Sequence, residues 1–315
     1  MATLKILEIK SEIGAGTRGA SLGADAIKLA ALQRRDPLFA RYSAEEIPDE
    51  NAVLLQEADY PYARYIDAMV RMYEKIIAKV KQSCADLYYP VLLSGDHATA
   101  GATIAGLKAA HPDLRLGTIW VDAHADLHTP LTTPSGNLHG MPLTIALNED
   151  NADCQKHQPQ AEALQYWKQL KNAGGSGGKI QPEDIVFIGL RDYEKEEAAL
   201  IEKYRIPVIT VGELRQAGAT ETAQRTLQLL FACDLIYLSF DVDSLDPDLS
   251  VGTGTPVPNG LTEEEAGALL VGLLQDRRVG CFEVTEVNPL LDTENKMANI
   301  AFRLLQKVLP VIQQP

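Results

Sequence analysis

The chain has 315 residues, of which 46% are hydrophobic and 23% are charged, so it can bury a large core as one or two α/β domains. Its formal net charge of −14 argues against a nucleic-acid or anionic-membrane partner. No run approaches the ~20 apolar residues of a membrane span, and the N-terminal segment lacks the apolar core of a signal peptide. The four cysteines show no CxxC spacing, which favours a reducing cytoplasm over a disulfide framework.

Short apolar runs alternate along the chain with longer segments of helical periodicity. The predicted strands are Leu4–Ile9, Tyr89–Ser94, Leu116–Val121, Asp184–Leu190, Pro207–Val211, Leu235–Phe240 and Cys281–Val287. Helices are expected over Ala24–Leu32, Pro61–Asp86 and Thr262–Gln275, the last with a capping box of Thr262 and Glu265. Strands that are apolar throughout and separated by helices indicate a mostly parallel sheet covered by helices on both faces.

The segment Asn172–Lys179 (NAGGSGGK) is the only low-complexity stretch. An interdomain linker can have this composition, but the alternation of strands and helices continues across it unchanged. We therefore interpret it as a flexible surface loop and expect residues 1–315 to form a single domain.

Polar clusters follow four of the predicted strands. They are Asp96 and His97 in VLLSGDH; Asp122, His124 and Asp126 in TIWVDAHAD; Asp241, Asp243 and Asp246 in IYLSFDVDSLDP; and Glu286 in FEVTEVNP. Ligands of open α/β sheets bind beyond the carboxyl ends of the strands, so these clusters are expected to converge on one site. Within DAHAD the polar residues alternate with apolar ones, so an extended chain would direct all three to one side.

The converging residues combine four carboxylates with two imidazoles and include no thiolate, which favours Mn²⁺ over a structural Zn²⁺ site. Two divalent ions would balance the four carboxylates, and two-metal sites lower the pKa of a bridging water. Taken singly, each Asp would be interpreted as a cap and each His as a core or surface group, but six such residues at three strand ends favour a metal site. Asp246, just before Pro247, is expected to shape a turn, and His111 and His157 are expected on the surface.

Longer motifs extend this pattern over nearly the whole chain. They are GDH at Gly95–His97, DAHAD at Asp122–Asp126, LTTPSGNLHG at Leu131–Gly140, SFDVDSLDP at Ser239–Pro247, GTGTPVPNGL at Gly252–Leu261 and EVNP at Glu286–Pro289. With these motifs in this order, the sequence resembles the ureohydrolase (arginase/agmatinase) family. The loop at Leu131–Gly140 is most similar to that of the arginases within the family.

The resemblance implies a three-layer α/β/α fold with a central, mostly parallel sheet, assembled as a trimer or hexamer. It implies two Mn²⁺ ions per subunit and a hydroxide bridging them, which attacks the guanidinium carbon of L-arginine to give ornithine and urea. The metal ligands that it implies are His97, Asp122, His124, Asp126, Asp241 and Asp243. Of these, Asp122 and Asp241 would bridge the two ions.

The same resemblance assigns roles around the metals. Glu286 would pair with the planar guanidinium, and His139 would pass a proton to the leaving amine. Asp126 would take part in catalysis as well as in metal binding. The residues expected to hold the substrate, directly or through water, are Ser135, Asn137, Asp192 and, from the glycine-rich loop, Thr255.

Several positions depart from the arginase pattern. His128 stands where arginases usually have an Asn that contacts the substrate α-carboxylate, and Glu194 stands where they usually have an Asp facing the α-amino group. Both are expected at the substrate. Ser94 and Ala98 also replace the commoner residues around His97. No metal ligand is lost, so hydrolysis is expected to persist, while agmatine, guanidinobutyrate or formiminoglutamate become alternative substrates.

Two other enzyme classes share parts of the pattern. Gly14–Gly19 matches GxGxxG, as in an NAD-dependent oxidoreductase, but Lys10–Ile13 separates it from the strand and no second strand with a terminal acid follows. A turn before the helix at Ala24–Leu32 is the favoured interpretation. A metal-dependent deacetylase would have a related fold, but its two-histidine charge-relay motif is missing from the sequence.

Overall fold

The computed structural model describes residues 3–313, which contain one eight-stranded sheet. All strands run parallel, in the order β2-β1-β3-β8-β7-β4-β5-β6. They are β1 (Thr3–Ile9), β2 (Ser43–Ile47), β3 (Tyr88–Ser94), β4 (Leu116–Val121), β5 (Ile185–Ile188), β6 (Val208–Ile209), β7 (Leu235–Asp241) and β8 (Val279–Thr285). The predicted α/β class is confirmed, and the sheet is parallel throughout.

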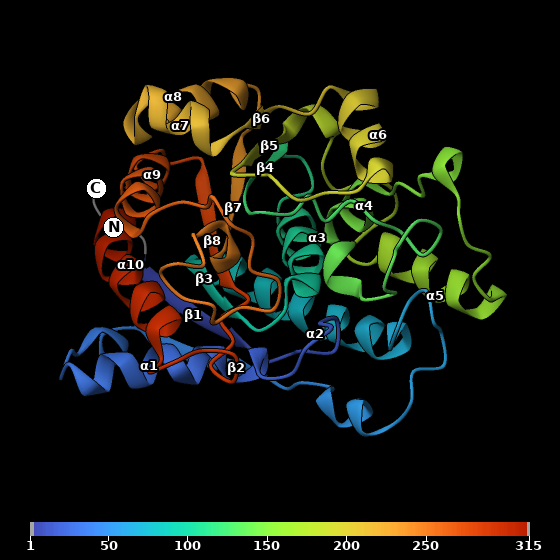
Figure 1. The fold of residues 1–315 in the computed structure, drawn as a ribbon, viewed down its shortest axis with the longest axis horizontal. Helices are drawn as coiled ribbons and strands as arrows, with labels where there is room; N and C mark the ends of the chain where they lie inside the picture. Colours follow the sequence, from blue (N-terminus) through green and yellow to red (C-terminus); the bar gives the residue numbers. More distant parts are fainter. Residues whose placement is uncertain (1–2, 314–315) are drawn as a thin grey trace.

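Helices cover both faces of the sheet (Figure 1). They are α1 (Gly23–Gln33), α2 (Ile66–Ala85), α3 (Ala100–Ala110), α4 (Pro142–Leu147), α5 (Ala161–Asn172), α6 (Lys195–Tyr204), α7 (Val211–Ala217), α8 (Ala219–Leu229), α9 (Glu263–Leu274) and α10 (Lys296–Ile312). In Figure 1, α9 and α10 lie on the side of the strands that carries the chain ends, and α2 to α5 lie on the other side. Between residues 3 and 313, no helix is long and apolar enough to cross a membrane.

The hydrophobic core is divided into two clusters by the sheet. In β4, Ile119 and Val121 belong to the cluster that includes α1, α9 and α10, whereas Trp120 belongs to the cluster that includes α2, α3 and α4. Successive side chains of a strand point to opposite faces, so a strand covered on both faces is apolar at every position. Every residue of β4 is buried. The expected three-layer α/β/α arrangement is therefore confirmed.

The edge strand β2 is absent from the predicted set because its sequence, SAEEI, is mostly polar. Only Ile47 is buried, and ion pairs with β1 and the residue after it stabilise the rest. Lys5 Nζ lies 2.6 Å from Glu45 Oε2, and Lys10 Nζ lies 2.7 Å from Glu46 Oε2. A strand held by such pairs carries no hydrophobic periodicity from which it could be predicted.

The start of α2 corrects the prediction of a helix from Pro61. The helix begins at Ile66, after Tyr65 adopts a left-handed backbone with φ 55°, and residues 61–65 form turns instead. By contrast, α9 begins with the predicted capping box. Thr262 Oγ1 accepts a hydrogen bond from Glu265 N at 3.1 Å, and Glu265 Oε2 accepts one from Thr262 N at 2.9 Å.

The predicted surface loop at residues 172–179 begins within α5, whose last residue is Asn172, and residues 173–179 follow the helix as a loop. Gly174, Gly175 and Gly177 have φ values of 73°, 144° and 80°. Glycine adopts these conformations without the steric cost that a Cβ would bring. The glycine content of this segment therefore reflects the turns that carry the chain from α5 towards β5.

Candidate metal centre and substrate pocket

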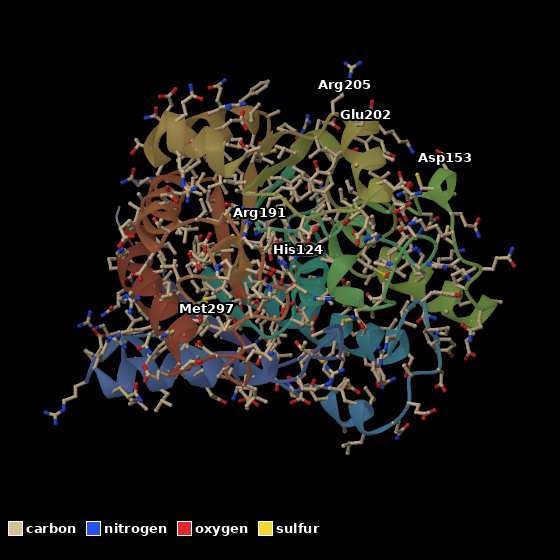
Figure 2. All side chains as sticks on the ribbon, in the orientation of Figure 1. His124, Asp153, Arg191, Glu202, Arg205 and Met297 are labelled. Carbon is tan, nitrogen blue, oxygen red and sulfur yellow. The ribbon has the colours of Figure 1, made fainter. Side chains whose placement is uncertain are left out.

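The four strands with polar ends lie side by side at the centre of the sheet, in the order β3-β8-β7-β4. Their carboxyl ends meet at one edge and open into a cavity of about 210 Å³. The cavity is lined by His97, His124, Asp126, His128, Thr133, Pro134, Ser135, Asn137, His139, Gly140, Asp192, Glu194, Glu197, Asp241, Asp243, Thr255 and Glu286. Of the predicted site residues only Asp122, which is 1% exposed, is missing from this lining. Figure 2 shows His124 in the middle of the molecule, whereas Arg205 points outward.

The first group of possible metal ligands centres on His97, which follows β3. Its Nδ1 lies 3.0 Å from Asp122 Oδ2, 3.1 Å from Asp126 Oδ2 and 3.1 Å from Asp241 Oδ2. One imidazole nitrogen thus faces three carboxylate oxygens that come from two neighbouring strand ends.

The orientation of the His97 ring is held by two residues that were not predicted as part of the site. Its Nε2 lies 2.8 Å from Ser239 Oγ, and its ring stacks on Trp120 with the centroids 4.1 Å apart. Ser239 is two residues before Asp241 in β7, so both side chains point to the same face of the strand. The two-residue spacing from Asp241 was the sequence signal from which Ser239 could have been predicted as a site residue.

Two buried atoms of this group, His97 Nδ1 and Asp122 Oδ2, have no hydrogen-bond partner among residues 3–313. Buried polar atoms are normally paired. Donor atoms around a divalent ion at about 2.1 Å lie roughly 3 Å apart, which is the spacing seen here. Burial would lower the pKa of His97, but the carboxylates of Asp122, Asp126 and Asp241 outweigh it and raise that pKa well above its ordinary value. The same carboxylates would attract a metal cation.

A second group joins Asp122, His124 and Asp243, whose ligand atoms all lie within 4.8 Å of one another. His124 Nδ1 is 2.9 Å from Asp243 Oδ2 and 3.6 Å from Asp122 Oδ1. Burial, followed by the nearby Asp122 carboxylate, raises the pKa of Asp243 to about 6. Because Asp122 belongs to both groups, the donor set could hold two adjacent cations.

The expectation of an extended chain through DAHAD is wrong. β4 ends at Val121, and Asp126 has a left-handed backbone with φ 52°. His124 N donates to Asp122 Oδ1 at 2.7 Å, so a tight turn gathers the three side chains. Glu286 is also left-handed, with φ 65°. This conformation costs a non-glycine residue about 1–3 kcal/mol and is concentrated at functional sites.

Glu286 and His139 form a carboxylate–imidazole pair in the cavity. Glu286 Oε1 accepts a hydrogen bond from His97 N at 2.8 Å and lies 3.5 Å from His139 Nδ1. Burial would lower the pKa of His139, but the Glu286 carboxylate outweighs it and raises that pKa. His139 can therefore hold a proton beside the metal centre.

The glycine turn Gly14–Gly19 packs against the same part of the cavity. Gly14 N donates to Asp96 Oδ2 at 3.0 Å. A Cβ added at Gly14 would lie 2.7 Å from Asp96 Oδ1, and one added at Gly16 would lie 2.7 Å from Asn137 Nδ2. These glycines allow the backbone to approach the site closely, so the motif is the turn that the sequence favoured.

His128 and Glu194, two of the departures from the family pattern, form a pair at the outer end of the cavity. His128 Nε2 lies 2.8 Å from Glu194 Oε2, and Nδ1 lies 3.2 Å from Thr132 Oγ1. Glu194 is also the N-cap of α6 and completes a capping box with Glu197. Both ring nitrogens of His128 are therefore engaged by the protein itself.

Glu197 lines the cavity but was not predicted as a site residue. Its Oε1 accepts a hydrogen bond from Leu127 N at 3.0 Å, and its Oε2 lies 3.4 Å from His128 Nε2. Burial raises the pKa of Glu197 well above its ordinary value. With His128 and Glu194 it forms a third cluster of possible ligand atoms. Glu197 follows Glu194 at the three-residue spacing of a capping box, and this spacing was the sequence signal from which it could have been predicted.

The four predicted substrate-holding residues Ser135, Asn137, Asp192 and Thr255 all line the cavity. Thr255 Oγ1 donates to Asp243 Oδ2 at 3.2 Å, which ties the glycine-rich loop to the second group of ligands. Asp192 Oδ2 lies 3.8 Å from His124 Nε2. All of the predicted metal-binding and substrate-holding residues except Asp122 thus line one cavity.

Asp246 and His157 lie outside the cavity lining. Asp246 Oδ2 accepts a hydrogen bond from Gly260 N at 3.0 Å, so it shapes a turn as predicted. His157, predicted on the surface, is half-buried there. It stacks on Tyr62 with the ring centroids 4.1 Å apart and places Nε2 2.7 Å from Thr133 O.

Known proteins and a family model match this chain over nearly its full length. The model of the Arginase family matches residues 2–310. The arginase of Bacillus subtilis (strain 168) is 33% identical over 309 residues, which are 98% of this chain and 97% of the relative. The arginase of Bacillus caldovelox is 34% identical over 310 residues, which are 97% of each chain. A solved structure of arginase from Bacillus caldovelox superposes with a TM-score of 0.84 at 33% identity, covering 100% of this chain and 99% of that one.

A parallel α/β/α fold with carboxylates and imidazoles gathered beyond its central strands is typical of metal-dependent hydrolases. The similarity along the full chain specifies the group within that class. The chain belongs to the arginase family and is a metal-dependent ureohydrolase.

Proposed function

We propose that this protein hydrolyses the guanidinium group of L-arginine to ornithine and urea, with two Mn²⁺ ions bound at the strand ends. Similarity over 97% of the chain or more to proteins named arginase supports the reaction. A donor set of carboxylates and imidazoles without thiolate supports Mn²⁺.

Six residues would hold the two ions. They are His97, with Asp122, Asp126 and Asp241 around one imidazole nitrogen, and His124 and Asp243, which lie next to Asp122. When bound, a pair of divalent ions lowers the pKa of water and supplies a nucleophile at neutral pH. The unpartnered Asp122 Oδ2 supports a role of this carboxylate as a metal ligand.

The residues around the metal centre bind the substrate and move its proton. The Glu286 carboxylate pairs with the guanidinium and orients its central carbon, since the planar fork matches a carboxylate. His139, 3.5 Å from Glu286, delivers a proton to the leaving amine. Thr255, bonded to Asp243, keeps the glycine-rich loop against the site.

The observation that carries the proposal is the set of three carboxylate oxygens 3.0–3.1 Å from His97 Nδ1. Its test is to load chelator-treated protein with Mn²⁺, Fe²⁺, Co²⁺ or Ni²⁺, count the bound ions by mass spectrometry, and measure urea and ornithine. Two Mn²⁺ per chain and equal amounts of urea and ornithine are expected. If none of these four ions supports the release of urea from L-arginine, the proposal is refuted.

A second candidate is hydrolysis of agmatine, guanidinobutyrate or formiminoglutamate, and the His128–Glu194 pair favours it. With both ring nitrogens engaged, His128 has no free donor for the α-carboxylate of arginine. A screen of urea, ammonia and formamide release across these compounds decides between the candidates. Higher kcat/KM for any of them than for L-arginine would transfer the assignment to that compound.

We also propose that the protein acts in the cytoplasm as a homo-oligomer, either a trimer or a hexamer. Its four cysteines all lie within the described residues and are free thiols, as expected in a reducing compartment. Light scattering of the purified protein tests the assembly, and a monomer at micromolar concentration would contradict it.

A further inference from the structure

A second cavity, of about 430 Å³, adjoins the substrate pocket at Ser135. It is lined by Gln56, Glu57, Ala58, Pro61, Arg64, Tyr65 and Ser135. Ser135 also lines the pocket at the metal centre, so the two spaces share a side chain that was predicted to hold the substrate. The second cavity is therefore placed to receive the end of a substrate that extends past Ser135.

Arg64 is the only cationic side chain in this lining. It is half-buried, and within residues 3–313 it has no carboxylate within 4.0 Å. Glu57 shares the cavity but is exposed and lies beyond that distance. The Arg64 guanidinium therefore has no internal counterion and is available to an anionic group of a ligand.

The backbone around Arg64 is fixed to the substrate-holding loop. Arg64 N donates to Gly136 O at 2.9 Å. Gly136 has φ 78°, and a Cβ there would lie 1.9 Å from Pro61 O, so the two loops are in direct contact. Tyr65 has φ 55° and donates from its hydroxyl to Gln56 O at 2.9 Å. Arg64 is therefore held next to Ser135 by residues on both sides of it.

The acidic part of the pocket lining is unsuited to a carboxylate. It consists of Asp192, Glu194 and Glu197, and His128 is already bonded to Glu194 and Thr132. This acidic part attracts an ammonium group and repels an anion. A guanidino amino acid that binds with its ammonium here must present its carboxylate to the side of Ser135 and the second cavity.

We propose that Arg64 is the specificity-determining residue that binds the α-carboxylate of the substrate, in place of the donor that His128 does not supply. The inference rests on the proposed arginine hydrolysis and names the group that selects an amino acid over a decarboxylated amine. A guanidinium–carboxylate pair is charge-assisted and bidentate, so it provides both affinity and orientation.

The test compares ligands with and without the carboxylate. Arg64→Gln and Arg64→Lys are measured for kcat and KM with L-arginine and agmatine, and by calorimetry with L-ornithine and putrescine on the Mn²⁺-loaded protein. For Arg64→Gln, kcat/KM for L-arginine and affinity for L-ornithine should fall about 10- to 100-fold, mostly through KM. Agmatine turnover and putrescine affinity should stay within about twofold, and Arg64→Lys should recover part of the loss.

A matched control separates this role from a general effect of charge. Arg71→Gln removes another arginine of the same region, which pairs with Glu50, and should retain the KM for L-arginine. Thermal melting shows whether each variant is folded.

Equal losses for ligands with and without the carboxylate, or an unchanged KM for L-arginine in Arg64→Gln, would overturn the role of Arg64. If the wild type releases no urea from L-arginine, the proposed reaction fails separately, and calorimetry still decides on Arg64. In that case, a loss of L-ornithine binding in Arg64→Gln without a loss of putrescine binding supports the inference. Equal effects on the binding of the two ligands, or no detectable binding of either, overturn it.

Discussion

The inner and outer ends of the substrate cavity are built in different ways. At the inner end the possible ligands come from the carboxyl ends of central strands, and Asp122, Asp241 and Asp243 are at most 2% exposed. At the outer end Asp192 and Glu194 are exposed residues on a loop before α6. A change at the inner end disturbs a buried cluster, whereas a change at the outer end alters a solvated surface. We therefore expect the sheet to specify the chemistry and the loops to select the substrate.

The strongest test of this comparison is removal of one charge at the inner end. Asp122→Asn and Asp241→Asn should each reduce urea release by about 10³-fold or more, because each carboxylate would bridge both ions. Calorimetry should show that each variant also binds Mn²⁺ more weakly. Asp246→Asn is the matched control, since Asp246 is bonded to the Gly260 backbone and should leave metal binding unchanged. Near-normal activity in Asp122→Asn would show that the cluster is not the metal centre.

Glu286→Gln separates substrate orientation from metal binding within the inner end. The variant keeps an acceptor for His97 N but loses the charge that faces the guanidinium. We expect kcat to fall by about 10²- to 10³-fold with the Mn²⁺ content unchanged, as measured by mass spectrometry. The pKa of His139 should also fall, because Glu286 raises it. Loss of metal in proportion to activity would mean that Glu286 is a ligand instead.

His128→Asn tests the outer end with a smaller expected effect. The change removes the 2.8 Å contact with Glu194 and offers an amide donor to the substrate. Because Glu194 is half-solvated, the KM for L-arginine should fall only about two- to fivefold, with kcat unchanged. His111→Asn, outside the cavity, serves as the control. A drop in kcat as large as that of Glu286→Gln would remove the distinction between the two ends.

The smallest effect on catalysis is expected at the amino ends of the strands, on the side of the sheet away from the site. Arg115 Nε lies 2.8 Å from Asp184 Oδ2, just before β4 and β5. Asp184→Asn should cost about 1 kcal/mol of unfolding free energy, measured by urea denaturation, and leave kcat unchanged. A reduced kcat would show that this edge is coupled to the site.

Asp184 also affects how the unfolding free energy depends on pH, because its carboxylate lies next to the Cys233 thiol. Burial, followed by Asp184, raises the pKa of the Cys233 thiol from 9.0 to about 12. Above pH 9 the unfolded chain loses this proton while the folded chain keeps it, so stability should fall as the pH rises from about 9 to 12. Thiol alkylation of the folded protein should be slow at pH 9 and faster in Asp184→Asn.

The inner end could be predicted from the sequence because its signals are local. Apolar runs mark the central strands, and a parallel sheet places their carboxyl ends along one edge. His97, Asp122 and Asp241 could therefore be brought together without knowing any distance. The turn at Asp126 could not be predicted, since its left-handed backbone depends on contacts made by the folded chain.

The outer end was harder to predict because its contacts join segments that are distant in sequence and carry no periodicity. Arg64 meets the Ser135 loop only through the turns that replace the expected first turn of α2. Glu197 was hidden inside a helical segment, where an acid near the N-terminus normally has a capping role. His128 was predicted at the substrate, but its engagement by Glu194 depends on a contact across 66 residues.

The order of the strands also determines when the site can form. β7 and β8 are the last strands in the sequence, yet they fill the middle of the sheet between β3 and β4. Without them the remaining strands make two separate halves, with His97 following one and Asp122 following the other. Pairings between such distant segments form slowly. A chain that ends before β7 therefore lacks both the strands that join the two halves and the residues Asp241, Asp243 and Glu286, so it cannot assemble the cluster.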